Sequence, residues 1–193
     1  MNFSIRMKHY KGGLTMELCA VAGPKPTRFK FGYKEENSLC RKIKKAMLRQ
    51  FRRLYRKKGV QRFYIGGTIG VNLWAGELLL KLKEEPGYEN LELVVVLPFP
   101  GYDAKWDVRS RKRLEYLIRH STEHLTVGTG DCRESYINQN RYLVDHAHYL
   151  VAVSEEREEQ ETDSFQVTAY AQEKGLEIIY IHPDTAEVTD VPK

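Results

Sequence analysis

Three glycines stand between an apolar run and a helix-forming segment, at Gly66, Gly67 and Gly70. A turn of this kind exposes backbone N–H groups at the positive end of a helix dipole, which attracts anions. Thr68 adds a hydroxyl donor within the turn. The spacing G-G-x-x-G is not the G-x-G-x-x-G of dinucleotide-binding folds, and the Lys-Ser/Thr pair of a P-loop is missing. We predict that residues 66–70 bind phosphate; the alternative is that the glycines serve only close packing of helix on strand.

A second loop of similar character covers residues 22–28 and follows the first apolar run. Gly23 lets the backbone approach a ligand, and the neighbouring prolines stiffen the loop. Lys25 and Arg28 carry positive charge that could neutralise a phosphate. The alternative is a surface loop whose cations are merely solvated. We predict Gly23 and Lys25 as ligand-binding residues.

The helix expected after the glycine turn carries two polar side chains in an otherwise apolar stretch. Asn72 lies in its first turn, beside the space for a ligand, and is predicted to bind it. Glu77 lies nearly two turns in, where an unpaired carboxylate is costly, so it should pair with a cation or contact a ligand hydroxyl. Further along, Phe99 and Trp106 follow the third apolar run. An aromatic ring there would stack on a base or pack in the core.

Other patterns for catalysis or metal binding do not emerge. The six histidines provide no third ligand at zinc-type spacing, and neither G-x-S-x-G nor C-x-x-C occurs. We therefore predict no metal and no cofactor, and leave catalysis undecided. The three scattered cysteines suit a reducing compartment, and the first sixteen residues lack an apolar stretch of signal-peptide length. A cytoplasmic protein without membrane contact is expected, with homo-oligomer formation left open.

Composition suits one domain, and charge is unevenly distributed along it. The 193 residues are 41% apolar and 30% charged, with a mean hydropathy of −0.54, which argues against disorder. Residues 1–62 carry 18 Lys or Arg against 3 acids (+15), and residues 63–193 carry 13 against 23 (−10), giving the net +5. Segment 41–58 holds ten cations and no acid, and an acidic run covers 155–163. This asymmetry indicates nucleic-acid or membrane contact, or else a solvated helix face and an acidic loop.

Short apolar runs alternate with segments of helical periodicity. Strands are expected at 17–22, 62–65, 91–97, 125–127, 149–153 and 176–181, and helices at 38–58, 71–85, 109–120, 136–146 and 165–174. Repeated β-α-β units make strands parallel through right-handed crossovers. We predict an α/β fold, a Rossmann-like open parallel sheet of about six strands with helices on both faces. Its ligand would lie beyond the carboxyl ends of the strands, where strand order reverses.

Several segments together match one known family. Ala22-Gly23-Pro24-Lys25-Pro26 is similar to T-G-x-R-P, and residues 66–77 are similar to G-x-x-G-V-D-x-W-A-A-E. In the same order follow Leu97-Pro98-Phe99, Trp106 and Tyr136…Asn140…Val144-Asp145. On these segments, residues 16–182 resemble the SLOG superfamily in its YpsA/YoqJ-like branch, Rossmann-like proteins related to DprA and the LOG proteins. Residues 1–15 would then be an N-terminal lead-in and 183–193 an irregular C-terminal tail.

The resemblance implies a nucleotide-type ligand, such as a nucleotide derivative or an ADP-ribose-like molecule, with Asn140 orienting it. The chain departs from the family at several positions. Lys25 stands for the usual arginine, Gln139 for a second arginine, and Asn72 for an acid. Before the last helix, Thr162-Asp163-Ser164-Phe165 replaces a glycine-glycine-threonine turn. Two cations weakened or lost, the missing glycine turn and the acidic run just upstream of it disfavour a polyanionic ligand.

Three functional hypotheses follow. The first is a SLOG-type protein that binds a nucleotide or nucleotide derivative in a sensor or regulatory role. The second is a phosphoribohydrolase-type enzyme that cleaves the N-glycosidic bond of nucleotides, with Glu77 as acid and base. The third is a nucleic-acid-binding module that uses the basic helix at 41–58.

Overall fold

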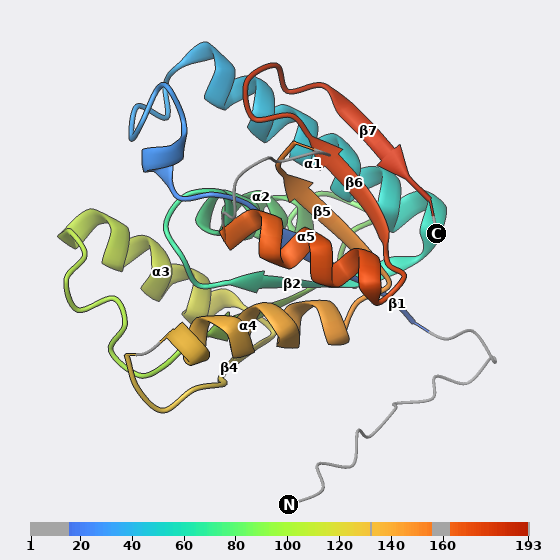
Figure 1. The fold of residues 1–193 in the computed structure, drawn as a ribbon. Coiled ribbons are helices and arrows are strands. Elements are labelled where there is room, and N and C mark those ends of the chain that lie inside the picture. The colour runs from blue at the N-terminus through green and yellow to red at the C-terminus, as the bar shows by residue number, and fades with distance from the viewer. Residues whose placement is uncertain (1–15, 132, 156–162, 193) are drawn as a thin grey trace, which may run out of the picture.

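A seven-stranded β-sheet forms the centre of the protein (Figure 1). The computed structural model describes residues 16–131, 133–155 and 163–192. The strands are β1 (Glu17–Ala22), β2 (Val60–Gly66), β3 (Glu92–Leu97), β4 (Glu123–Thr126), β5 (Tyr149–Val153), β6 (Glu177–Ile181) and β7 (Val188–Val191). Their order is β4-β3-β2-β1-β5-β6-β7, parallel throughout except for antiparallel β7. The direction of progress reverses between β1 and β5, which is where such sheets bind ligands.

Helices cover both faces of the sheet (Figure 1). On one face lie α1 (Ser38–Lys58), α2 (Val71–Lys83) and α3 (Val108–His120), and on the other lie α4 (Arg133–Asp145) and α5 (Asp163–Glu173). Successive residues of β1 alternate between the two cores: Cys19 and Val21 face the first layer, and Ala20 and Ala22 the second. Burial on both faces explains the continuous apolar runs of the strands. The predicted Rossmann-like α/β fold is confirmed.

The chain after residue 183 is where the expected secondary structure is wrong. Instead of an irregular tail it forms β7, paired with β6. Val188 and Val191 are half-buried against the two cores, while Thr189 and Asp190 between them are exposed. Four residues are too few for such a pattern to identify a strand without knowledge of the neighbouring edge. The predicted lead-in at 1–15, and residues 156–162 of the acidic run, lie outside the described residues.

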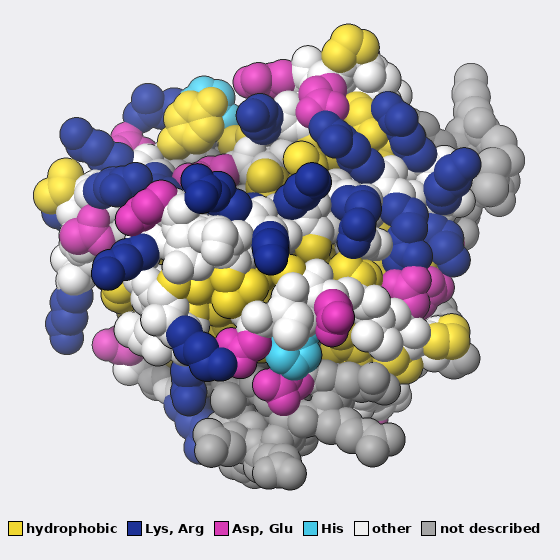
Figure 2. Space-filling model, turned by 90° about the horizontal axis from the view of Figure 1, so that it is seen from above, with side chains coloured by type: hydrophobic (Ala, Val, Ile, Leu, Met, Phe, Trp, Pro, Cys, Tyr) yellow, Lys and Arg dark blue, Asp and Glu magenta, His cyan; other side chains and the backbone are white. Residues whose placement is uncertain are grey.

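Helix α1 is amphipathic and crosses the face of the molecule shown in Figure 2, where Lys and Arg side chains predominate. The Asn37 side chain accepts a hydrogen bond from the Leu39 N–H at 2.8 Å and so caps the helix start. Gly59, at φ 72°, ends the helix in the left-handed conformation that glycine adopts without strain. Because the apolar stripe of α1 packs on the sheet, its cations are directed outward.

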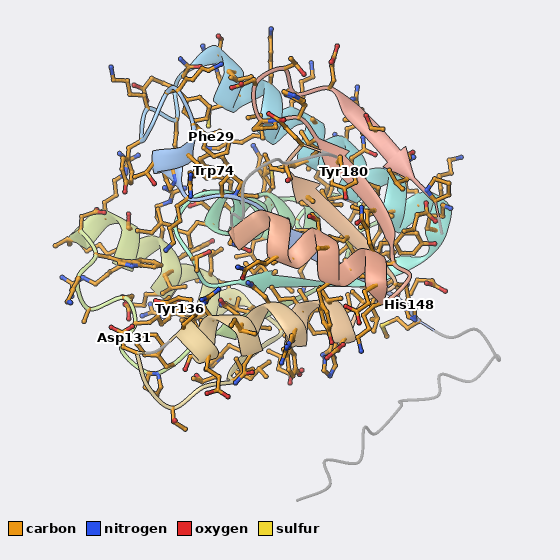
Figure 3. The ribbon with its side chains drawn as sticks, viewed as in Figure 1. Phe29, Trp74, Asp131, Tyr136, His148 and Tyr180 are labelled. Carbon is orange, nitrogen blue, oxygen red and sulfur yellow. The ribbon has the colours of Figure 1, made fainter. Side chains whose placement is uncertain are left out.

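Aromatic rings attach the loop after β1 to α2. Phe29 and Phe31 stack with ring centroids 4.8 Å apart, and Phe29 also lies 5.4 Å from Trp74, a fully buried residue of α2 (Figure 3). This loop begins with the short 3₁₀ helix η1 (Pro26–Arg28). Burial of these large aromatic rings therefore determines the path of the loop, and its exposed cations do not.

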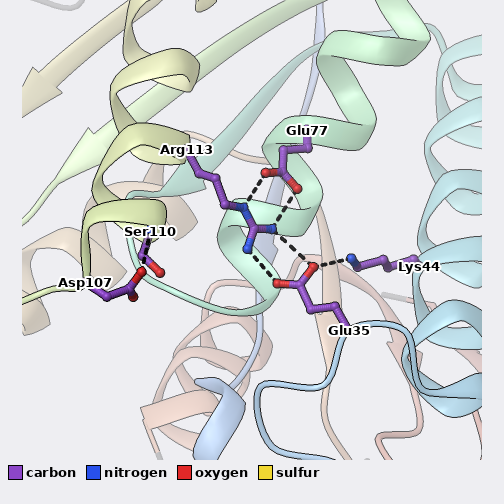
Figure 4. A network of polar contacts seen from close by, with 6 residues as sticks. All are labelled: Glu35, Lys44, Glu77, Asp107, Ser110 and Arg113. Carbon is purple, nitrogen blue, oxygen red and sulfur yellow. Dashed lines mark hydrogen bonds and ion pairs between the residues drawn. The ribbon is translucent and has the colours of Figure 1, made fainter.

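An ion-pair network joins the three helices of this layer (Figure 4). Arg113 of α3 donates to both carboxylate oxygens of Glu77 in α2, at 2.6 and 2.8 Å, and to Glu35 at 2.6 Å. Lys44 of α1 donates to the same Glu35 carboxylate at 2.5 Å. Burial alone would raise the pKa of Glu35, but the hydrogen bonds from Arg113 and Lys44 outweigh it and lower that pKa to about 2. The ionised form of Glu35 therefore stabilises the folded state.

Replacing Glu35 with glutamine should change the pH dependence of stability. The Glu35 pKa falls from 4.5 to about 2 on folding, so its contribution is complete above pH 4.5 and is lost as the pH falls toward 2. We expect Glu35→Gln to lower the free energy of unfolding by about 1–2 kcal/mol at pH 7, after solvent screening. The loss should shrink on acidification. Urea unfolding over a pH series measures this.

The matched control is Glu115→Gln, which removes a carboxylate from the exposed pair with Arg119 at 2.6 Å. It should change stability by no more than about 0.5 kcal/mol at any pH. Parallel pH profiles for the wild type and Glu35→Gln would contradict the assigned role of Glu35.

Candidate ligand-binding site

A cavity of about 110 Å³ lies at the carboxyl ends of β1 and β2, beside the point where strand order reverses. Its volume is several times the roughly 10–15 Å³ that one water molecule needs. The loop after β1, the turn after β2 and helix α4 contribute its main polar walls. The predicted ligand-binding residues that line it are Gly23, Lys25, Gly66, Thr68, Asn72 and Asn140. Residues that were predicted from three separate segments thus come together in one place.

Asn72 shapes the glycine turn from within. Its side-chain oxygen accepts the Gly66 N–H at 2.9 Å, and its amide nitrogen donates to the Thr68 Oγ1 at 2.8 Å. Asn72 is 7% exposed, so these bonds satisfy a nearly buried amide. Because the Thr68 oxygen is the acceptor in this bond, its hydroxyl proton remains to be donated. Asn72 therefore holds the turn in shape and presents the hydroxyl of Thr68.

The backbone amides of the turn divide into two groups. Gly67 donates to the Val96 carbonyl at 3.1 Å, and Val71 to the Pro24 carbonyl at 3.4 Å. Within the described part of the chain, the amides of residues 68–70 have no such partner. Gly67 and Gly70 thus belong to the turn but are not among the residues that line the cavity. Of residues 68–70, Thr68 alone is among the described residues that line the cavity, so its amide is the one placed to donate there.

Close packing of two loops accounts for two of the glycines. A Cβ at Gly23 would lie 2.6 Å from a Val71 methyl group, and one at Gly70 would lie 2.7 Å from the Pro24 carbonyl oxygen. Gly70 also has φ +97°, a conformation that other residues rarely adopt. Both explanations offered for the glycines, packing and access to the cavity, therefore hold: Gly70 permits packing, Gly66 lines the cavity, and Gly23 does both.

Helix α4 supplies a wall that includes residues the sequence did not identify as site residues. Gln139 is buried and donates from Nε2 to the Val96 carbonyl at 2.7 Å. Tyr136 lies in the first turn of α4, with its ring 5.8 Å from the Lys25 ammonium (Figure 3). Both line the cavity. The sequence indicated only that a helix begins here after a strand, where ligand sites often lie. Which face of α4 meets the cavity depends on how the helix packs on the sheet.

The predicted stacking residues lie elsewhere. Phe99 is 6% exposed and meets the edge of Tyr136, with centroids 5.7 Å apart. Trp106 packs edge-on against Tyr102 at 5.4 Å. Neither lines the cavity, so the aromatic ring on its wall is that of Tyr136. Tyr102 in turn donates its hydroxyl to the Gly67 carbonyl at 2.5 Å, so this aromatic group supports the glycine turn from behind.

Glu77 is also away from the cavity. It is held by Arg113 and lines a separate surface groove with residues of α3. The charged residues that line the cavity are Lys25 and Arg28, and no acid occurs among its described lining residues. This composition attracts an anion and provides no carboxylate for acid–base chemistry.

The part of the chain that the structure describes also lacks two other features. No three His, Cys, Asp or Glu side chains there come together in a way that could hold a metal ion. None of the helices in that part has both the length and the apolar character needed to cross a bilayer.

Substituting alanine for Gly70 should separate the two packed loops. The variant combines a strained positive φ with a Cβ that meets backbone, which cannot move aside as a side chain can. We expect a loss of at least about 2 kcal/mol in the free energy of unfolding, measured with urea. Gly32→Ala is the matched control, since Gly32 has φ +57° and open space around its Cβ position. It should cost about 1 kcal/mol; equal losses would mean that the contact with Pro24 is unimportant.

Several proteins of known sequence or structure are similar to this chain over most of its length. The UPF0398 protein of Bacillus licheniformis is 29% identical over 144 residues, covering 73% of this chain and 76% of the relative. That of Bacillus cereus strain B4264 is 28% identical with the same coverage. DprA of Streptococcus pneumoniae superposes with a TM-score of 0.55 at 13% identity, covering 86% of this chain and 50% of DprA. This likeness concerns the fold.

DprA of Helicobacter pylori, whose structure was described for its single-stranded DNA binding mode, gives a TM-score of 0.53 at 15% identity. The match covers 85% of this chain and 64% of that protein, so this chain spans between half and two thirds of the DprA chains. The family model YpsA, described as the YspA SLOG family, matches residues 19–186 and includes every segment that lines the cavity. The chain therefore belongs to the YspA SLOG family.

Proposed function

We propose that this protein binds a nucleotide or nucleotide derivative by its phosphate, in a sensor or regulatory role. The observation that carries the proposal is the composition of the cavity at the switch point of the sheet. Its charged lining residues are Lys25 and Arg28, and Thr68, which can donate its hydroxyl and its backbone N–H, lines the same cavity. A phosphate can satisfy all of these groups at once.

The size and charge of the cavity limit the bound group. Small-molecule pockets usually measure about 300–1,000 Å³, so about 110 Å³ suits a phosphate with part of a sugar, and the rest of the ligand would extend outward. Two cations balance the charge of a phosphate monoester, which is about −1.5 to −2 at neutral pH. A nucleoside monophosphate or a singly anchored derivative fits this balance better than a triphosphate does.

Binding without hydrolysis is favoured by the position of Glu77. Its carboxylate accepts two hydrogen bonds from Arg113, and it is not among the residues that line the cavity. A general acid must lie within hydrogen-bond reach of the bond it cleaves. The phosphoribohydrolase hypothesis therefore ranks below the binding hypothesis.

A thermal-unfolding panel tests the proposal, with nucleoside monophosphates, ADP-ribose and inorganic phosphate as probes. A ligand at a hundred times its Kd should raise Tm by about 5–10 °C. Lys25→Met removes one of the two cavity cations and should reduce the shift. Lys34→Met is the matched control, because Lys34 is an exposed cation nearby in the chain that does not line the cavity.

Two outcomes would reject the proposal: no Tm shift with any probe at millimolar concentration, or equal shifts in Lys25→Met and the wild type. The same nucleotides are also assayed for release of free base. Release that Glu77→Gln abolishes would show hydrolysis and restore the enzymatic hypothesis.

A further inference from the structure

The cations of α1 fall into two groups. Lys44, Arg52, Arg53 and Lys58 form ion pairs with Glu35, Glu85, Asp190 and Glu177. The other cations of the helix are exposed and, within the described part of the chain, have no acidic partner: Arg41, Lys42, Lys45, Arg49, Arg56 and Lys57. A helix whose role is only to cover the sheet needs no such surplus of unpaired positive charge.

Most of these unpaired cations form one stripe. Arg41, Lys45 and Arg49 are four residues apart, so they share a helix face and succeed one another by about 6 Å along the axis. Arg56 continues the stripe to a total of about 23 Å. The same face appears in Figure 2 as a broad area of Lys and Arg side chains. We call this row, with Lys42 beside it, the α1 stripe.

We propose that the α1 stripe docks the sugar-phosphate backbone of duplex DNA without reading its sequence. Duplex DNA carries one negative charge per about 1.7 Å of its axis, so a stripe of this length lies against several phosphates at once. Neutralising them releases condensed counterions, which favours binding at low salt. Arginine and lysine side chains make most such contacts, and they position a protein on DNA without selecting bases.

The burial of the opposite face of α1 argues against a membrane surface. Its large apolar residues Ile43, Met47, Phe51 and Leu54 are fully buried against the sheet. A helix that lies in a membrane interface must insert apolar side chains into the acyl region. With its apolar face committed to the core, α1 offers charge alone.

The lack of an exposed aromatic residue on α1 argues for a duplex over a single strand. Proteins that bind single strands combine positive charge with aromatic rings on which bases stack. The exposed large hydrophobic residues of the described chain are Tyr33, Val108 and Tyr116, and none lies on α1. Tyr55 of α1 is half-buried and packs against Tyr88, with centroids 4.9 Å apart. A convex row of cations matches the outside of a duplex, whose bases are already stacked.

Fluorescence anisotropy with a labelled 20-base-pair duplex at a series of salt concentrations tests the proposal on the full chain. If four to six phosphates are contacted, log K should fall against log salt with a slope of about −3.5 to −5.5. The double variant Lys45→Glu/Arg49→Glu should bind at least about tenfold more weakly and reduce the slope by about 2. Arg53 is avoided, because it already forms an ion pair with Asp190.

The matched control is Arg109→Glu/Lys112→Glu on α3, which reverses two exposed cations elsewhere and changes net charge equally. It should bind like the wild type, and circular dichroism verifies that both double variants fold. Equal weakening in the control would mean that binding follows net charge and not the α1 stripe, and would overturn the proposal.

Further arms compare a single strand of the same sequence and vesicles containing anionic lipid. Tighter binding to either of them than to the duplex, or no duplex binding at low salt, would also overturn the proposal. Lys25→Met should leave duplex binding unchanged, so this experiment and the nucleotide panel succeed or fail separately.

Discussion

The close approach of two loops at the carboxyl end of β1 and β2 determines the rest of the site. Gly23 packs against Val71, and Gly70 packs against the Pro24 carbonyl, with no space for a side chain at either glycine. This contact sets the start of α2 directly beside the loop that carries Lys25. The Gly70–Pro24 contact involves backbone atoms, which cannot rotate aside as a side chain can. Because Gly23 and Pro24 also line the cavity, this packing sets part of the cavity wall.

One group of charged residues stabilises the fold, and a different group lines the cavity. The ion pairs among Arg113, Glu77, Glu35 and Lys44 join three helices on one face of the sheet. The opposite charges of these four residues neutralise one another. The cavity, at the carboxyl ends of the central strands β1 and β2, keeps its cations without acidic neighbours among the described lining residues. Because opposite charges cancel within the network, it contributes little field at the cavity. The cations that line the cavity, Lys25 and Arg28, are therefore outside this network.

The sequence was sufficient for the fold apart from β7, and for part of the site. Strands buried on both faces appear as apolar runs, and ligand sites follow such strands, so Gly23, Lys25 and Thr68 could be found by order alone. Tyr136 and Gln139 could not, because the side of α4 that faces the cavity is decided by packing against β2 and β3. The periodicity of a sequence also does not show which side chains of different helices form ion pairs. For that reason Glu77 was a plausible catalytic group until its bonds to Arg113 were seen.

Asn72 shows how a departure from a family pattern can leave a site intact. The family carries an acid at this position, by the resemblance drawn from the sequence. A carboxylate could accept the Gly66 N–H but could not donate to Thr68 as the amide does at 2.8 Å. The exchange removes a negative charge from the cavity wall and orients the Thr68 hydroxyl. Both effects favour an anion at the glycine turn, and they offset the exchange of arginine for Lys25, which keeps the charge but loses the bidentate geometry. The described lining of the cavity therefore keeps a positive charge balance, with Lys25 and Arg28 as its charged residues.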